Sequence, residues 1–120
     1  MPQYAIYPSL EGRTVYITGG ATGIGAAMVR AFAGQGARTG FVDMAEEEGR
    51  TLAGELGDQV AFQPCDLRDI DQLRSAFGML KERIGPAAVL VNNAARDDRH
   101  KWQDVTVEYW DERMATNLRH

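Results

Sequence analysis

The sequence predicts an α/β fold with three layers, in which helices cover both faces of a parallel sheet. One observation is periodicity, because short runs of β-branched, aromatic or apolar residues alternate with amphipathic helical stretches along all 120 residues. Such alternation is typical of parallel βαβ units with right-handed crossovers. A second observation is that residues suited to ligand chemistry directly follow strands, at the sheet edge where such folds bind ligands. We expect one domain over residues 1–120.

Local signals delimit the elements of the first half. The run from Arg13 to Thr18 is β-branched and aromatic, which favours a strand, and a helix is expected from Gly23 to the glycines at 34 and 36. A second strand is expected over 38–43, a second helix over 46–56 and a third strand over 59–63. The first helix is predicted to bury an apolar stripe formed by Ile24, Ala27, Met28, Ala31 and Phe32.

The second half continues the alternation. A third helix has apolar residues from Leu73 to Ile84 and is stopped by the Gly85-Pro86 pair. The segment Ala87–Val91 is continuously apolar, as expected for a strand covered on both faces. A last helix is expected from about Thr106, its N-cap. One face of it, which we take to be buried, is predicted to carry Trp110, Met114 and Asn117.

Composition and charge narrow the class of protein. Lys and Arg number 13 against 17 Asp and Glu, and the net charge of −4 argues against nucleic acid as the main partner. The longest nearly apolar stretch, 86–91, is too short for a membrane span, and the N-terminal Met-Pro-Gln-Tyr shows no secretory signal. The single cysteine, Cys65, is interpreted as a buried small residue rather than a nucleophile. Basic residues dominate the loop 96–101, so no metal site is predicted there, and a cytoplasmic protein is expected.

A glycine-rich turn follows the first predicted strand. The residues Thr-Gly-Gly-Ala-Thr-Gly-Ile-Gly at 18–25 lead from that strand into a helix. Glycine allows backbone N–H groups to approach a bulky anion closely, and a helix N-terminus supplies unsatisfied donors with partial positive charge. The strand before the turn and the helix after it give the context of a pyrophosphate site. The sequence therefore predicts nucleotide binding here.

Polar residues at the ends of the next strands extend this predicted site. Asp43, about 20 residues beyond the turn, is placed to accept hydrogen bonds from both ribose hydroxyls of NAD and to repel the 2′-phosphate of NADP. The alternative is an Asp that caps the following helix. Asp66 and the backbone of Leu67 are suited to bind adenine, although Asp is common in strand-end turns. The amides at 92–93 need hydrogen-bond partners, which a neighbouring strand and a cofactor would supply.

Together these segments resemble the N-terminal half of the short-chain dehydrogenase/reductase superfamily. The T-G-x-x-x-G-I-G string, Asp43, the Asp66-Leu67 pair, N-N-A at 92–94 and Asn117 occur in the order of that family. The resemblance implies a Rossmann-type fold that is incomplete at its C-terminal side, with NAD as cofactor. The residues that it implies to hold the pyrophosphate, ribose, adenine and inner face of NAD are Gly19, Gly23, Ile24, Gly25, Asp43, Asp66, Leu67, Asn93 and Ala94.

The resemblance also bears on catalysis. Asn117 matches the Asn of the Asn-Ser-Tyr-Lys tetrad of the family, in which Asn holds a water of the proton relay while Tyr removes the hydroxyl proton and hydride passes to the nicotinamide. The alternative is an Asn that merely ends the last helix. None of the tyrosines is followed four residues later by lysine. We therefore interpret residues 1–120 as an NAD-binding domain cut before the catalytic Tyr-x-x-x-Lys, and expect this chain alone to be inactive.

Further segments are similar to bacterial NAD-dependent sugar dehydrogenases of the family, namely 5–10, 97–101, 109–113 and 117–120. This similarity implies a parent enzyme that oxidises an aldose such as D-xylose at C1 to the lactone, and that forms a dimer or tetramer. Ala95 departs from the usual Gly, and Arg96 stands where this group often has a smaller polar residue. Two alternatives stay open. One is another short-chain dehydrogenase, such as a 3-oxoacyl reductase or a polyol dehydrogenase, and the other is a non-catalytic nucleotide-binding or dimerising module.

Overall fold

A parallel sheet forms the centre of the computed structural model, which describes residues 5–120. Its strands are β1 (Thr14–Thr18), β2 (Arg38–Asp43), β3 (Val60–Pro64) and β4 (Val89–Val91). Their order is β3-β2-β1-β4, so the chain moves outward from β1 to β3 and then returns to the other side of β1. The N-terminal residues 1–4, which we interpreted as lacking a secretory signal, lie outside the described residues.

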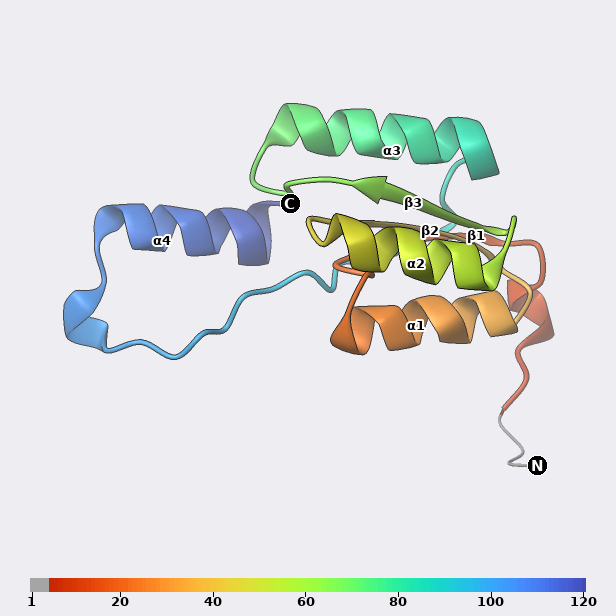
Figure 1. The fold of residues 1–120 in the computed structure, drawn as a ribbon, viewed down its shortest axis with the longest axis horizontal. Coiled ribbons are helices and arrows are strands. Elements are labelled where there is room, and N and C mark those ends of the chain that lie inside the picture. Colours follow the sequence, from red (N-terminus) through yellow and green to blue (C-terminus); the bar gives the residue numbers. More distant parts are fainter. Residues whose placement is uncertain (1–4) are drawn as a thin grey trace.

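Helices cover both faces of this sheet, with α1 and α2 on one side and α3 on the other (Figure 1). The helices are α1 (Gly23–Gly34), α2 (Glu46–Leu56), α3 (Ile70–Ile84) and α4 (Val107–Met114). Two 3-10 turns, η1 (Pro8–Leu10) and η2 (Trp102–Asp104), and a π-helical turn, η3 (Ala115–Arg119), complete the secondary structure. The predicted fold class and the predicted order of strands and helices are confirmed.

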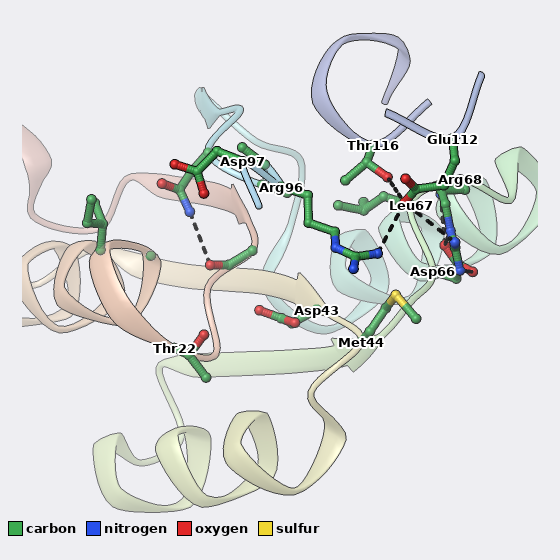
Figure 2. A pocket seen from close by; sticks show the side chains of 16 residues that line it. Thr22, Asp43, Met44, Asp66, Leu67, Arg68, Arg96, Asp97, Glu112 and Thr116 are labelled. Atoms are coloured by element: carbon green, nitrogen blue, oxygen red, sulfur yellow. Dashed lines mark hydrogen bonds and ion pairs between the residues drawn. The ribbon is translucent and has the colours of Figure 1, made fainter. Parts of the chain in front are cut away.

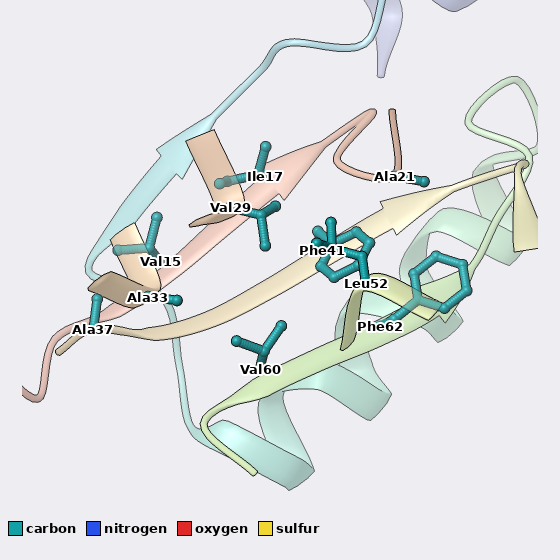
Figure 3. Packing of buried hydrophobic residues seen from close by; sticks show 10 residues of the cluster. All are labelled: Val15, Ile17, Ala21, Val29, Ala33, Ala37, Phe41, Leu52, Val60 and Phe62. Carbon is teal, nitrogen blue, oxygen red and sulfur yellow. The ribbon is translucent and has the colours of Figure 1, made fainter. Parts of the chain in front are cut away.

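The central strand β1 contributes to the apolar clusters on both faces of the sheet and leads into the glycine turn. Successive side chains of a strand point to opposite faces, so Val15 and Ile17 join the apolar cluster beside α1 and α2 (Figure 3), whereas Tyr16 joins the cluster beside α3. The Tyr16 hydroxyl donates a hydrogen bond to the Gly85 carbonyl at 2.5 Å, and its ring stacks on Phe77. Because β1 is buried throughout, its carboxyl end is a rigid base for the glycine turn.

The buried face of α1 differs from the predicted one. Gly25, Val29 and Ala33 face the sheet. The helix is turned this way because Gly25 lies against the start of the turn, where a Cβ would come within 1.8 Å of the Gly19 carbonyl oxygen. A glycine at a packing position leaves no mark in the pattern of apolar side chains. Of the predicted stripe, Met28 and Phe32 are half-buried, and the exposed members are Ile24, Ala27 and Ala31.

Two further predictions of burial, for β4 and for α4, are wrong. Strand β4 pairs only with β1 within the described residues, and Leu90 is 54% exposed, so the strand is an edge strand rather than one covered on both faces. Helix α4 stands beyond the carboxyl ends of the strands (Figure 1), and its predicted buried face, with Trp110, Met114 and Asn117, is exposed. The predicted N-cap is confirmed, because the Thr106 hydroxyl accepts a hydrogen bond from the Tyr109 amide at 3.1 Å.

Candidate functional site

A pocket of about 500 Å³ lies at the carboxyl ends of the strands (Figure 2). The strand order reverses here between β1 and β4, which leaves a crevice that connecting loops do not fill. Of the predicted site residues, Gly23 and Asn117 are not part of the lining. Those that line the pocket are Gly19, Ile24, Gly25, Asp43, Asp66, Leu67, Asn93 and Ala94.

The glycine turn brings three backbone segments into close contact. Gly19 has a φ of +68°, a conformation that favours glycine, and a Cβ at this position would lie 2.9 Å from the Cα of Ala94. A Cβ on Gly25 would overlap the carbonyl oxygen of Gly19, as described above. Since the start of α1, the end of β1 and the end of β4 all meet here, the backbone itself forms the floor of the pocket.

The N-terminus of α1 presents backbone donors to the pocket. Thr22 is the N-cap residue, but its side chain makes no capping hydrogen bond, and the first helical bond runs from the Ala26 amide to the Thr22 carbonyl at 3.2 Å. The amides of the first turn are thus without the acceptor that a capping side chain supplies. Ile24 and Gly25 of that turn line the pocket, so this end of α1 has the donors and the dipole that an anion requires.

Asp43 holds two pieces of backbone together at the pocket wall. Its Oδ2 accepts a hydrogen bond from the Ala21 amide and its Oδ1 one from the Ala45 amide, each at 3.0 Å. The first bond braces the glycine turn, and the second stabilises the entry into α2, so a structural role of the kind that we left as an alternative is present. Each carboxylate oxygen keeps a further acceptor site, and Asp43 lines the pocket.

Asp66 is engaged by a residue that the sequence analysis missed. The Arg68 guanidinium donates to both carboxylate oxygens of Asp66, at 2.9 and 2.8 Å. These hydrogen bonds hold the pKa of the Asp66 carboxyl below its usual range. Neighbouring Cys65 is buried, and burial, followed by the negative charges of Asp66 and Asp69, raises the pKa of its thiol to about 11. The thiol is therefore protonated at neutral pH.

Side-chain hydrogen bonds join the ends of β1 and β4. The Thr18 hydroxyl accepts from the amides of Asn93 and Ala94, each at 3.0 Å. The Asn93 side-chain amide donates to the carbonyls of Thr18 and Gly19, each at 3.1 Å, so the expectation that it ties neighbouring strands is met. Because the Thr18 oxygen already accepts two hydrogen bonds, its own proton goes to Nε2 of His120, 2.9 Å away.

Asn117 pairs with the backbone of Arg96 rather than lining the pocket. Its Oδ1 accepts from the Arg96 amide at 2.7 Å, and its Nδ2 donates to the Arg96 carbonyl at 2.9 Å. Asn117 lies within the π-helical turn η3, a type of turn that is frequent at functional sites. The side chain therefore does more than end a helix, because it fixes the segment that follows β4.

Charged residues form the side of the pocket nearest α4. Glu112 of α4 faces the guanidinium groups of Arg68 and Arg96, at 3.7 and 3.5 Å, and that of Arg113 at 2.8 Å. Arg96 also pairs with Asp98 at 2.8 Å. Neither Arg68 nor Glu112 was among the site residues predicted from the sequence. Their pairing joins residues more than 40 positions apart, for which the local pattern holds no signal.

Comparison with known proteins agrees with this geometry. A family model described as short chain dehydrogenase matches residues 13–119. The D-xylose 1-dehydrogenase of Caulobacter vibrioides is 50% identical over 119 residues, which cover 97% of this chain and 46% of that protein. A probable galactose dehydrogenase of Rhizobium meliloti is 48% identical over 118 residues, which cover 95% of this chain and 46% of that protein. The chain spans about half the length of these relatives.

Solved structures of the same architecture lead to the same family. A 3-ketoacyl-(acyl-carrier-protein) reductase from Brucella melitensis complexed with NADH is 27% identical, with a TM-score of 0.84 over 91% of this chain and 46% of that chain. An actinorhodin polyketide ketoreductase with NADPH is 30% identical, with a TM-score of 0.81 over 88% of this chain and 42% of that chain. No helix among residues 5–120 has the length and apolar character that a membrane span needs. The chain belongs to the short-chain dehydrogenase family.

Proposed function

We propose that residues 1–120 are the NAD-binding part of an oxidoreductase that oxidises an aldose. The observation that carries the proposal is the convergence, in one pocket, of the uncapped start of α1 and the Asp43 carboxylate. The amides of the glycine turn would hold the pyrophosphate, and the free acceptor sites of Asp43 would take the ribose hydroxyls. The positions where a Cβ would clash, Gly19 and Gly25, leave room for a backbone cradle of this kind.

The charge at the pocket wall supports NAD rather than NADP. A 2′-phosphate would bring negative charge beside Asp43, and two like charges 4 Å apart repel by about 4 kcal/mol at an intermediate dielectric, before screening. Thr22 and Met44, which also line this part of the pocket, are neutral, and the two guanidinium groups of the lining, those of Arg68 and Arg96, are paired with carboxylates. Leu67 borders the same end of the pocket, where its backbone would meet the adenine ring.

The reaction assigned to the parent protein is the oxidation of an aldose to the lactone, in which C1 loses a hydride and its hydroxyl group loses a proton. NAD, when bound, accepts the hydride. The role proposed for Asn117 is positioning, because its side chain holds the backbone of the segment after β4. The names of the two similar sugar dehydrogenases support the substrate class. We assign the parent to the cytoplasm as a dimer or tetramer, and expect residues 1–120 alone to bind the cofactor without catalysing its reduction.

Titration calorimetry with NADH and NADPH tests the cofactor assignment. We expect NADH to bind at least roughly tenfold more tightly than NADPH, a difference of about 1.4 kcal/mol. Asp43→Asn keeps an acceptor oxygen for the backbone but removes the charge, so it should narrow the gap between the two cofactors. Asp58→Asn, on the exposed turn before β3, is the matched control and should leave the gap unchanged. Equal affinity for both cofactors in the unmodified chain, or no binding of either, would refute the assignment.

A separate assay addresses the sugar. The full-length protein that contains this chain should form NADH from D-xylose or D-galactose, and residues 1–120 alone should not. NADH formation by the short chain would contradict its expected inactivity. Formation from polyols but not from aldoses would instead assign the protein to the polyol dehydrogenase alternative.

A further inference from the structure

The pocket has an unfavourable balance of charge for a pyrophosphate. Among the described residues, its lining carries four carboxylates and two guanidinium groups, the latter from Arg68 and Arg96. A bound pyrophosphate would add two negative charges to this excess. The amides at the start of α1 offset part of the repulsion through partial charges only. An arginine that is able to turn toward the phosphates would offset the rest.

Arg68 is committed elsewhere. Its guanidinium donates through Nε and Nη2 to the two carboxylate oxygens of Asp66, which is the strong two-point geometry of an arginine–carboxylate pair. Its carbonyl oxygen also accepts a hydrogen bond from the Arg119 side chain. Both contacts hold Arg68 at the end of the pocket formed by Asp66 and Leu67, away from the glycine turn.

Arg96 combines a fixed backbone with a weakly held side chain. Asn117 bonds both its amide and its carbonyl, and Ala94, two residues before it, lies against Gly19 of the turn. The guanidinium, in contrast, contacts a single oxygen of Asp98, through Nε at 3.0 Å and Nη2 at 2.8 Å, in a pair whose side chains are 54% and 58% exposed, and reaches Glu112 at 3.5 Å. Ion pairs this exposed contribute little to stability. The guanidinium of Arg96 is thus free to change partners while its Cα stays beside the glycine turn.

The geometry points to Arg96 as a phosphate-binding residue of this site, a role that rests on the proposed function. Figure 2 shows the Arg96 side chain extending into the pocket toward Glu112, between that residue and Asp43. When a dinucleotide binds, the guanidinium leaves Asp98 and Glu112 and turns to the pyrophosphate, to which its fork of donors can bind at two points. Asp98 and Glu112 compete with the phosphates for Arg96 and so weaken cofactor binding.

A series of ligands with and without phosphates tests this role. Calorimetric titrations of the whole chain use adenosine, ADP and NADH as probes. Arg96→Gln should weaken ADP and NADH binding by roughly tenfold or more and leave adenosine binding unchanged, because only the phosphates lose a charged partner. Glu112→Gln should do the opposite and tighten ADP binding. Arg99→Gln, an exposed arginine of the same loop, is the matched control and should change none of the three. Circular dichroism checks that each variant is folded.

Results that contradict the role of Arg96 can be distinguished from results that contradict the proposed function. Unchanged ADP binding in Arg96→Gln, with normal binding in the unmodified chain, overturns the role of Arg96 and leaves the proposed function standing. Tighter binding of all three ligands in that variant also overturns it, since Arg96 would then be an obstacle in the pocket rather than a phosphate partner. If the unmodified chain binds neither ADP nor NADH, the proposed function fails and the role of Arg96 fails with it.

Discussion

The hydrogen bonds of Thr18 allow a quantitative test of how β1 and β4 are joined. Thr18 is 1% exposed, and its side-chain oxygen accepts from the amides of Asn93 and Ala94 at 3.0 Å each. In Thr18→Val the shape is kept and the acceptor is lost, which leaves two amides without a partner. An unsatisfied buried donor costs about 1–3 kcal/mol. Because these two amides are only partly buried, we expect the free energy of unfolding to fall by roughly 2–4 kcal/mol in total.

The loss is large against the total stability of about 5–15 kcal/mol that is usual for a folded domain. Urea unfolding followed by circular dichroism measures it. Thr39→Val is the matched control, because Thr39 is fully buried in β2 and its hydroxyl makes one long hydrogen bond, to Ala37 at 3.4 Å. That variant should change the free energy of unfolding by less than about 1 kcal/mol. Thr18→Ser should retain most of the stability. A Thr18→Val variant no less stable than Thr39→Val would refute the reasoning.

Three more outcomes follow from contacts described above. Gly25→Ala should prevent NADH binding and lower the free energy of unfolding, because its Cβ would lie 1.8 Å from a carbonyl oxygen. Gly54→Ala, in open space on α2, should instead raise the free energy of unfolding by about 0.5–1 kcal/mol. Calorimetry measures NADH binding and urea unfolding measures stability, and retained NADH binding in Gly25→Ala would contradict the packing argument. The pKa of Asp66 is lowered by Arg68, so the stability that this pair contributes is present above the ordinary pKa of about 4 and is lost as the pH falls below it. Urea unfolding of the unmodified chain and Arg68→Gln should therefore give different free energies at neutral pH that converge in acid, and a constant difference would argue against this linkage. The Cys65 thiol, buried and with a pKa of about 11, should react with a thiol reagent at neutral pH only after unfolding, and rapid labelling of the folded chain would show the burial to be wrong.

The order and type of the elements were predictable because each strand and helix has its own local signal. β-branched runs marked the strands, and glycines marked where helices end. The start of α3 lies three residues before Leu73, the first apolar position on which the prediction rested, because the Asp69 side chain accepts from the amides of Asp71 and Gln72 and so begins the helix at Ile70. The burial of β4 and α4 was not predictable, because it depends on neighbouring elements and not on the periodicity of the segment itself.

The candidate site likewise combines residues that were predictable from the sequence with residues that were not. The glycine turn and Asp43 were found from sequence because their spacing follows from the geometry of a βαβ unit. The ion pairs that surround them were not found. Glu112 meets Arg68 only because the chain returns past the sheet after β4, and the two residues carry no common pattern. Similarly, the rotation of α1 depends on Gly25, whose contribution is the absence of a side chain.

The double attachment of Asp43 has a consequence for how the proposed preference for NAD could change over evolution. The carboxylate that would distinguish the two ribose forms also anchors the loop on one side and the next helix on the other, through the amides of Ala21 and Ala45. Replacing it with a residue that has no side-chain acceptor removes both anchors at once. A lineage that moved toward the phosphorylated cofactor would therefore need compensating substitutions in the loop or at the helix entry, and selectivity at this position would change in concert with its surroundings rather than alone.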